Sequence, residues 1–135
     1  MQVRVGVDVV NVDEVAASVA TYGDRYLHRI YSDAEIADCV GTPPAQAASL
    51  AARFAAKEAT LKALRVSADV PPWPALEVRR RSDGSPELHL RPDAAAVAER
   101  AGVRSLDVSL SHEGPIATAV VVALVDDAAE PSRDL

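Results

Sequence analysis

The feature that most constrains this chain is an alanine-rich stretch over residues 53–64 that contains neither glycine nor proline. Alanine is the strongest helix former, and an uninterrupted run of good helix formers predicts a helix. We expect the helix to extend from about residue 45 to residue 65, because a Gly-Thr-Pro-Pro break at residues 41–44 precedes it. The other elements are then expected to pack around this long central helix.

Four charged residues interrupt the apolar helix: Arg53, Lys57, Glu58 and Lys62. Side chains four residues apart share a helix face, so Glu58 lies beside Lys62, while Arg53 and Lys57 share a neighbouring face. Three cations around one carboxylate can hold a metal ion together with a polyphosphate. The alternative is a surface ion pair between Glu58 and Lys62, which stabilises a helix by only about 0.2–0.5 kcal/mol.

The size and charge of the chain limit the kind of protein it can be. Its 135 residues and 49% hydrophobic content predict one domain over residues 1–125, followed by a loose acidic tail over residues 126–135. The net charge of −6 argues against a nucleic-acid-binding surface. No apolar run approaches the roughly 18 residues of a membrane span, and the single cysteine, Cys39, is expected to be a small buried residue in a reducing compartment. We therefore expect a cytoplasmic protein that binds neither nucleic acid nor membranes.

The rest of the chain combines short helices with β-strands. β-Branched runs and alternating apolar residues predict the strands, and a Ser-Asp-Gly-Ser turn joins two of them in a hairpin. Ser32 and Glu35 have the spacing of a capping box at the start of a short helix. The predicted strands are 3–10, 76–80, 87–90, 105–110 and 117–125, and the predicted shorter helices are 12–22, 24–30, 33–36 and 92–101. The fold class is therefore α+β, with an antiparallel sheet packed against the long helix and the shorter ones.

Polar residues outside the long helix could complete a site. Asp8 interrupts the first strand near its end, where a carboxylate needs a partner. Asp8 and Glu58 together could bind Mg²⁺, which uses one or two carboxylates plus substrate phosphates, although Asp8 could instead cap the helix that follows. Ser109, Ser111 and His112 stand at the end of a later strand. The serines lack the Gly-x-Ser-x-Gly context of a hydrolase, and a lone histidine has many structural uses.

Three segments carry these residues in order along the chain. They are Gly6-Val7-Asp8-Val9-Val10, Arg53-Phe54-Ala55-Ala56-Lys57-Glu58-Ala59 with Lys62-Ala63-Leu64, and Ser109-Leu110-Ser111-His112-Glu113. In order and spacing the segments resemble the holo-acyl-carrier-protein synthases, the small single-domain 4′-phosphopantetheinyl transferases. The resemblance runs from about residue 3 to residue 125; the long-helix motif is highly specific and the other two are moderately specific.

The resemblance implies a reaction in which coenzyme A (CoA) donates its phosphopantetheine arm to a serine of an acyl carrier protein. The other product is adenosine 3′,5′-bisphosphate. It further implies that Asp8 and Glu58 hold Mg²⁺, and that Glu58, or a water that it orients, is the base for the serine hydroxyl. Lys62 is then placed to stabilise or protonate the leaving phosphate.

The resemblance also assigns residues to CoA and implies an assembly. Arg53 and Lys57 would bind the phosphates of the nucleotide. Ser109, Ser111 and His112 would bind its adenosine and 3′-phosphate side. The family fold is α+β and typically a homotrimer with active sites between subunits, so these segments can meet across an interface rather than within one chain.

The chain departs from the family pattern directly after residues 62–64. Arg65 stands where the family usually has a glycine that opens a glycine-containing loop, so a flexible backbone approach to the phosphates is absent. The Arg65 guanidinium could substitute for that loop in binding CoA, because it lies on the helix face of Leu61 and Lys62.

A second departure concerns the carrier protein. Family members commonly carry basic residues early in the first helix, facing the acidic recognition helix of the carrier, whereas this chain has Asp13 and Glu14 there. Arg25 and Arg29, farther along, remain basic. We hypothesise that the carrier docks mainly through Arg25 and Arg29 and is a less acidic or specialised carrier, because facing like charges slow encounter and weaken binding.

Two other interpretations stand beside the transferase. One is a non-catalytic CoA- or carrier-binding module that retains the fold, which only the departures at Arg65 and at Asp13 and Glu14 support. The other treats every charge on the long helix as part of a solvated surface, which requires three separate coincidences. Carriers of fatty-acid biosynthesis and of polyketide biosynthesis are both compatible with the sequence.

Overall fold

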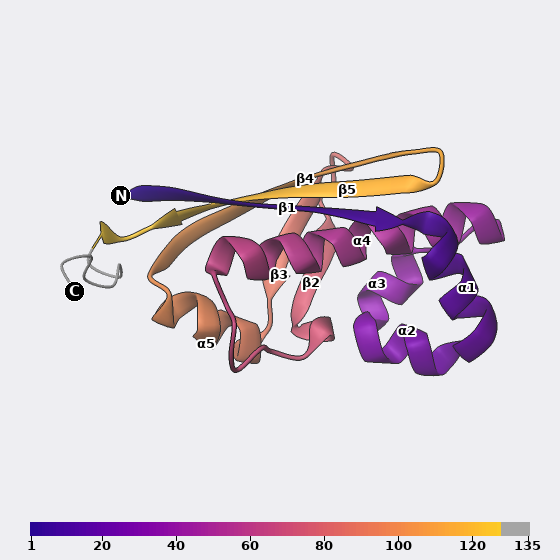
Figure 1. Cartoon of the computed structure of the whole chain (residues 1–135), viewed down its shortest axis with the longest axis horizontal. Coiled ribbons are helices and arrows are strands. Elements are labelled where there is room, and N and C mark those ends of the chain that lie inside the picture. Colours follow the sequence, from indigo (N-terminus) through magenta and orange to yellow (C-terminus); the bar gives the residue numbers. More distant parts are fainter. Residues whose placement is uncertain (128–135) are drawn as a thin grey trace.

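A computed structural model describes residues 1–127 of the chain. A three-stranded antiparallel sheet lies along one side of the long helix α4 (Pro43–Leu64), and the shorter helices lie on its opposite side (Figure 1). The strand order is β1 (Gln2–Asn11), β5 (Ile116–Val125) and β4 (Val103–Glu113), so β5 is central. Helix α4 is therefore covered on two sides. Its many alanine side chains are small and apolar, so they can be buried on both sides.

The second layer contains the shorter elements. Helices α1, α2 and α3 gather beside the N-terminal half of α4, while a two-stranded hairpin and α5 lie beside its C-terminal half (Figure 1). These elements are α1 (Val12–Tyr22), α2 (Asp24–Ile30), α3 (Asp33–Asp38), the 3₁₀ turn η1 (Trp73–Ala75), β2 (Leu76–Arg80), β3 (Pro86–Leu90) and α5 (Pro92–Arg100). The predicted α+β class is confirmed.

The contact between α4 and β1 is a backbone contact. A Cβ atom placed on Gly6 would lie 1.9 Å from the carbonyl oxygen of Ala59 and 2.8 Å from the backbone nitrogen of Ala63. Ala55, Ala59 and Ala63 are all fully buried, and their spacing of four puts them in one row on the helix. Alanines on the helix and a glycine on the strand therefore let the two backbones approach closely.

Strand β1 directs alternate side chains to opposite faces of the sheet. Gly6 and Asp8 lie on the face covered by α4, whereas Val5 and Val7 lie on the outer face and are 60% and 52% exposed. The register continues this outer face across the central strand, where Val5 pairs with Val122. The sheet thus has one face packed on α4 and one apolar face that no described residue covers.

The long helix begins earlier than expected. It starts at Pro43 rather than at residue 45, with the Thr42 hydroxyl oxygen accepting a hydrogen bond from the backbone N–H of Ala45 at 3.3 Å. Proline is tolerated in the first helical turn because the N–H it lacks would have no intrahelical partner there. The prolines that predicted a break therefore mark the helix start.

Other boundaries differ less. Strand β4 is longer than the predicted 105–110, because it pairs with β5 as far as Glu113. The capping box of Ser32 and Glu35 is confirmed. Of the predicted tail, Asp126 bonds through its N–H to the Gly102 carbonyl at 2.9 Å, whereas residues 128–135 lie outside the described residues. Within residues 1–127, no helix has both the length and the apolar composition that crossing a membrane requires.

We predict that Gly6→Ala destabilises the chain by about 3 kcal/mol or more, because the added methyl group meets backbone atoms that can move only with the whole helix. Denaturant unfolding measures the change. The control is Gly84→Ala, where an added Cβ meets nothing within 4 Å and only the positive φ of 89° costs stability, about 1–2 kcal/mol. Equal losses in the two variants would contradict the close approach.

Candidate functional site

Three predicted site residues, Asp8, Glu58 and Lys62, lie close together where α4 packs on β1. The Lys62 ammonium donates to Oδ1 of Asp8 at 3.0 Å and to the Val7 carbonyl oxygen at 2.9 Å. The Asp8 side chain is only 14% exposed, while that of Lys62 is 55% exposed. Lys62 therefore pairs with the strand, and the alternative of a mere surface pair between Glu58 and Lys62 does not describe this arrangement.

Asp8 does not cap the following helix. The N-cap of α1 is Asn11, whose side-chain oxygen accepts from the backbone N–H groups of Asp13 at 2.9 Å and Glu14 at 3.3 Å. The capping alternative for Asp8 is therefore wrong. Asp13 and Glu14 occupy the first turn of α1, where negative charge is favourable beside the positive end of the helix dipole.

Asp8 lies close enough to Glu58 to affect the pKa of the Glu58 carboxyl group. Partial burial raises the pKa of Glu58, the negative charge of Asp8 raises it further, and Lys62 opposes both effects. Two carboxylates that repel each other at a partly buried position are stabilised by a cation between them. The site thus has the electrostatic character of a cation site even with Lys62 in place.

The ligand count fits a hard divalent cation that shares its coordination with substrate. Among residues 1–127, no three histidine, cysteine, aspartate or glutamate side chains form a group that could hold a metal ion by themselves. Asp8 and Glu58 supply two carboxylates, and Mg²⁺ is commonly bound by one or two carboxylates with phosphate oxygens and waters. The residues present therefore fit Mg²⁺ held jointly with a phosphorylated substrate.

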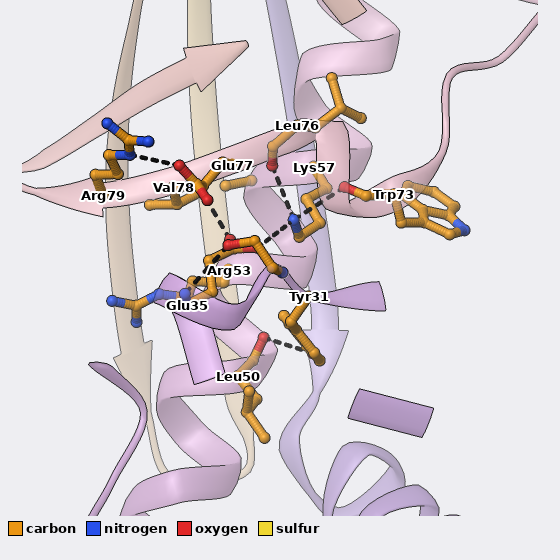
Figure 2. A network of polar contacts seen from close by, with 12 residues as sticks. Tyr31, Glu35, Leu50, Arg53, Lys57, Trp73, Leu76, Glu77, Val78 and Arg79 are labelled. Carbon is orange, nitrogen blue, oxygen red and sulfur yellow. Dashed lines mark hydrogen bonds and ion pairs between the residues drawn. The ribbon is translucent and has the colours of Figure 1, made fainter. Parts of the chain in front are cut away.

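Lys57 and Arg53 lie on the side of α4 that faces α3 and β2 (Figure 2). Lys57 is fully buried, and its ammonium donates to Glu35 Oε1 at 2.7 Å. Arg53 is 5% exposed, and its Nη2 atom lies 3.8 Å from Asp38 Oδ2. Because α3 and β2 cover the side of the helix on which these charges lie, their burial argues against the expected binding of nucleotide phosphates by Arg53 and Lys57.

The strand motif with Ser109, Ser111 and His112 is divided between the two faces of the sheet. Ser109 aligns through Val120 of β5 with Val7, so both serines lie on the outer face, opposite to Asp8. His112 alternates with them, lies on the inner face and is exposed. Within one chain the serines therefore cannot join Asp8, Glu58 and Lys62.

The family now follows from sequence and structure together. The profile of the 4′-phosphopantetheinyl transferase superfamily matches residues 4–121. The chain belongs to this superfamily. Among its relatives, the holo-[acyl-carrier-protein] synthase of Chloroflexus aggregans is 43% identical over 132 residues, covering 90% of this chain and 94% of that protein. The enzyme of the same name from Dehalococcoides mccartyi is 39% identical over 118 residues, covering 87% of this chain and 95% of that protein.

Solved structures agree with this membership. The ACPS–CoA complex of Chronobacterium ammoniagenes superimposes with a TM-score of 0.83 at 27% identity, covering 93% of this chain and 99% of that one. A holo-[acyl-carrier-protein] synthase from Helicobacter pylori in complex with coenzyme A gives a TM-score of 0.77 at 26% identity, covering 89% and 99%. The predictions of family, fold and enzyme class, a 4′-phosphopantetheinyl transferase, are confirmed.

Arg65 ends α4 in this transferase with left-handed backbone angles, φ 57° and ψ 40°. A glycine is the usual residue in this conformation at a helix C-terminus, and other residues adopt it at a cost of about 1–3 kcal/mol. The exposed Arg65 lines a cavity of about 430 Å³ together with Arg4 and Arg100. Three arginines and one carboxylate, Asp69, thus line a cavity just beyond the helix end, three residues after Lys62.

Arg25 and Arg29 of the transferase border a second cavity, of about 590 Å³, between α1 and α2. Tyr22, Tyr26 and Trp73 also line this cavity, so its walls combine cations with aromatic rings. The aromatic side chains were missed in the sequence, although Tyr22 and Tyr26 stand four residues apart beside Arg25. Trp73 comes from a distant loop, and no local pattern indicates that it joins them.

Proposed function

We propose that the chain is a Mg²⁺-dependent holo-acyl-carrier-protein synthase that transfers 4′-phosphopantetheine from coenzyme A to a serine of an acyl carrier protein. Family membership and the CoA complexes of structural relatives support the reaction and the donor. The observation that carries the proposal is the meeting of Asp8, Glu58 and Lys62 at the contact between β1 and α4. Apart from the departures at Arg65 and at Asp13 and Glu14, no feature of the described residues favours a non-catalytic module over this enzyme.

The chain's own residues suit in-line transfer between two oxygen atoms. The serine oxygen attacks the β-phosphorus of CoA, and the bond from that phosphorus to the oxygen of the departing adenosine 3′,5′-bisphosphate breaks. Asp8 and Glu58 would hold the Mg²⁺, which would neutralise charge on the pyrophosphate. Glu58 accepts the proton of the serine hydroxyl, and the Lys62 ammonium stabilises or protonates the leaving phosphate.

Arg65 is proposed to bind the donor. It is exposed, it lies three residues from Lys62, and it adds to the positive charge around the cavity shared with Arg4 and Arg100. A guanidinium binds phosphate oxygens in a bidentate manner that a glycine backbone cannot reproduce. His112 is retained as a further candidate for the nucleotide, because it is exposed on the same sheet face as Asp8.

The carrier protein is proposed to dock at the cavity bordered by Arg25 and Arg29. Both arginines are exposed on α2, whereas Asp13 and Glu14 stand in the first turn of α1. Carboxylates of the carrier would meet the arginines, and the aromatic walls would accept apolar side chains from the same surface. A cytoplasmic location is part of this proposal.

The active enzyme is proposed to be a homotrimer with sites shared between subunits. The outer face of the sheet carries exposed apolar side chains that a monomer would leave in water. These are Val3, Val5, Val7 and Val9 on β1, with Ile116, Val120, Val122 and Leu124 on β5. Ser109 and Ser111 lie on the same outer face, on β4, so contact between copies through this face would enclose them at the interface.

Transfer is tested by incubating the protein with CoA, Mg²⁺ and an apo carrier protein and weighing the carrier by mass spectrometry. We expect the carrier to gain phosphopantetheine, and Asp8→Asn and Glu58→Gln each to lower kcat/KM by at least about 100-fold. Glu99→Gln, an exposed carboxylate on α5, is the control and should be unaffected. Undiminished transfer by Glu58→Gln would exclude the role given to this residue.

The shared site is tested by charging the outer face of the sheet. Val5 and Val122 pair directly on that face, so Val5→Lys with Val122→Lys should give a monomer in sedimentation experiments and abolish transfer. The control Val40→Lys changes an exposed valine that lies away from the sheet and should leave both properties intact. If the doubly substituted chain is monomeric and keeps full activity, the shared site is contradicted.

A further inference from the structure

Lys57 has no role in the site as described, yet its ammonium is among the most completely enclosed polar groups of residues 1–127. The side chain is fully buried between α4, α3 and β2 (Figure 2). An ammonium has three N–H donors, and the structure gives it three acceptors. They are Glu35 Oε1 at 2.7 Å, the Trp73 carbonyl oxygen at 3.0 Å and the Leu76 carbonyl oxygen at 2.8 Å.

The two carbonyl groups bracket a single turn. Trp73 is the first residue of η1, and Leu76 is the first residue of β2 that follows it. One side chain therefore holds both ends of the 3₁₀ turn against α4. The preceding loop, residues 66–72, contains no regular element, so it offers little independent support for the position of this turn.

Glu35 connects the same ammonium to two other elements. Its Oε1 atom also accepts from the backbone N–H of Ser32 at 3.0 Å, and its Oε2 atom accepts from the backbone N–H of Val78 at 3.0 Å. The Lys57–Glu35 pair thus joins the N-terminus of α3 to strand β2 and helix α4. Buried ion pairs are weak evidence for stability, but full hydrogen bonding makes them effective at fixing one geometry.

The turn that Lys57 holds also forms a wall of the docking cavity. The Trp73 ring lies 5.2 Å from the Phe54 ring, centroid to centroid, and Trp73 lines the cavity that Arg25 and Arg29 border. Glu58 directly follows Lys57 on α4 and faces β1, because neighbouring residues of a helix are turned by about 100°. Lys57, which holds Trp73, and Glu58, which lies beside Asp8, are thus neighbours on one turn of α4. That turn therefore sets the position of the Trp73 wall relative to the two carboxylates.

We propose that Lys57 is a positioning residue that fixes the Trp73 wall of the carrier-docking cavity relative to Glu58. The inference rests on the proposed docking of the carrier at Arg25 and Arg29. Lys57 itself touches neither the carrier nor CoA. Its loss should therefore weaken carrier binding without changing how the donor binds.

The test replaces both partners, because removing Lys57 alone would leave the Glu35 carboxylate buried without its cation. Lys57→Met with Glu35→Gln nearly keeps the side-chain volumes and removes both charges. We expect the KM for the carrier to rise by about tenfold, which corresponds to about 1.4 kcal/mol of docking free energy, while the KM for CoA stays unchanged.

Trp73 supplies a readout of position that is independent of activity, because it is the chain's single tryptophan. In the double variant its fluorescence should shift to longer wavelength and be quenched more strongly by acrylamide. The matched control is Val125→Ala, a fully buried change at the far end of the sheet, which should lower stability but alter neither the fluorescence nor the KM for the carrier.

Two further variants make every outcome decisive. Arg25→Ala with Arg29→Ala should raise the KM for the carrier; if it does not, the proposed docking surface is wrong, and the inference fails with it. If that variant does raise the KM but the Lys57→Met, Glu35→Gln variant leaves the KM and the fluorescence at their original values, the positioning role alone is overturned. Should the latter variant not fold, Lys57→Arg, which keeps a cation beside Glu35 but changes the geometry of its donors, should show the same changes in smaller measure.

Discussion

The close approach of the α4 backbone to strand β1 at Gly6 is the constraint on which the site depends. Without a side chain at Gly6, and with alanines at positions 55, 59 and 63, the helix can lie directly on the strand. Asp8, two residues from Gly6, then comes within hydrogen-bond distance of Lys62 and close enough to Glu58 to raise its pKa. A bulkier contact would separate the carboxylates that the proposed chemistry requires on one ion.

Helix α4 performs two tasks because it is covered on two sides. The side facing β1 carries Glu58 and Lys62, which suit phosphate chemistry. The side facing α3 and β2 carries Lys57, which is held by Glu35 and by two carbonyl groups. Adjacent residues thus have separate roles, and both follow from the roughly 100° turn between neighbours on a helix. This arrangement connects the proposed carrier cavity to the proposed metal site through one rigid element.

Much of the fold could be predicted from the sequence, and the site only in part. Periodicity identified the helices and strands, and the spacing of Glu58 and Lys62 placed them on one helix face. Periodicity could not show that Lys57 lies on a buried side, because that depends on which elements cover a helix that is apolar nearly all round. The division of Ser109 and His112 between two faces follows from strand alternation, which becomes decisive only once the strand is known to extend to Glu113.

The central claim, that Asp8 and Glu58 jointly form one divalent-cation site, is tested most directly by binding Mn²⁺ as a paramagnetic probe and following its EPR signal in the presence of CoA. We expect Asp8→Asn and Glu58→Gln each to weaken Mn²⁺ binding by at least about tenfold and Glu99→Gln to leave it unchanged. Mn²⁺ affinity that is the same in the parent chain and in both site variants would contradict the account.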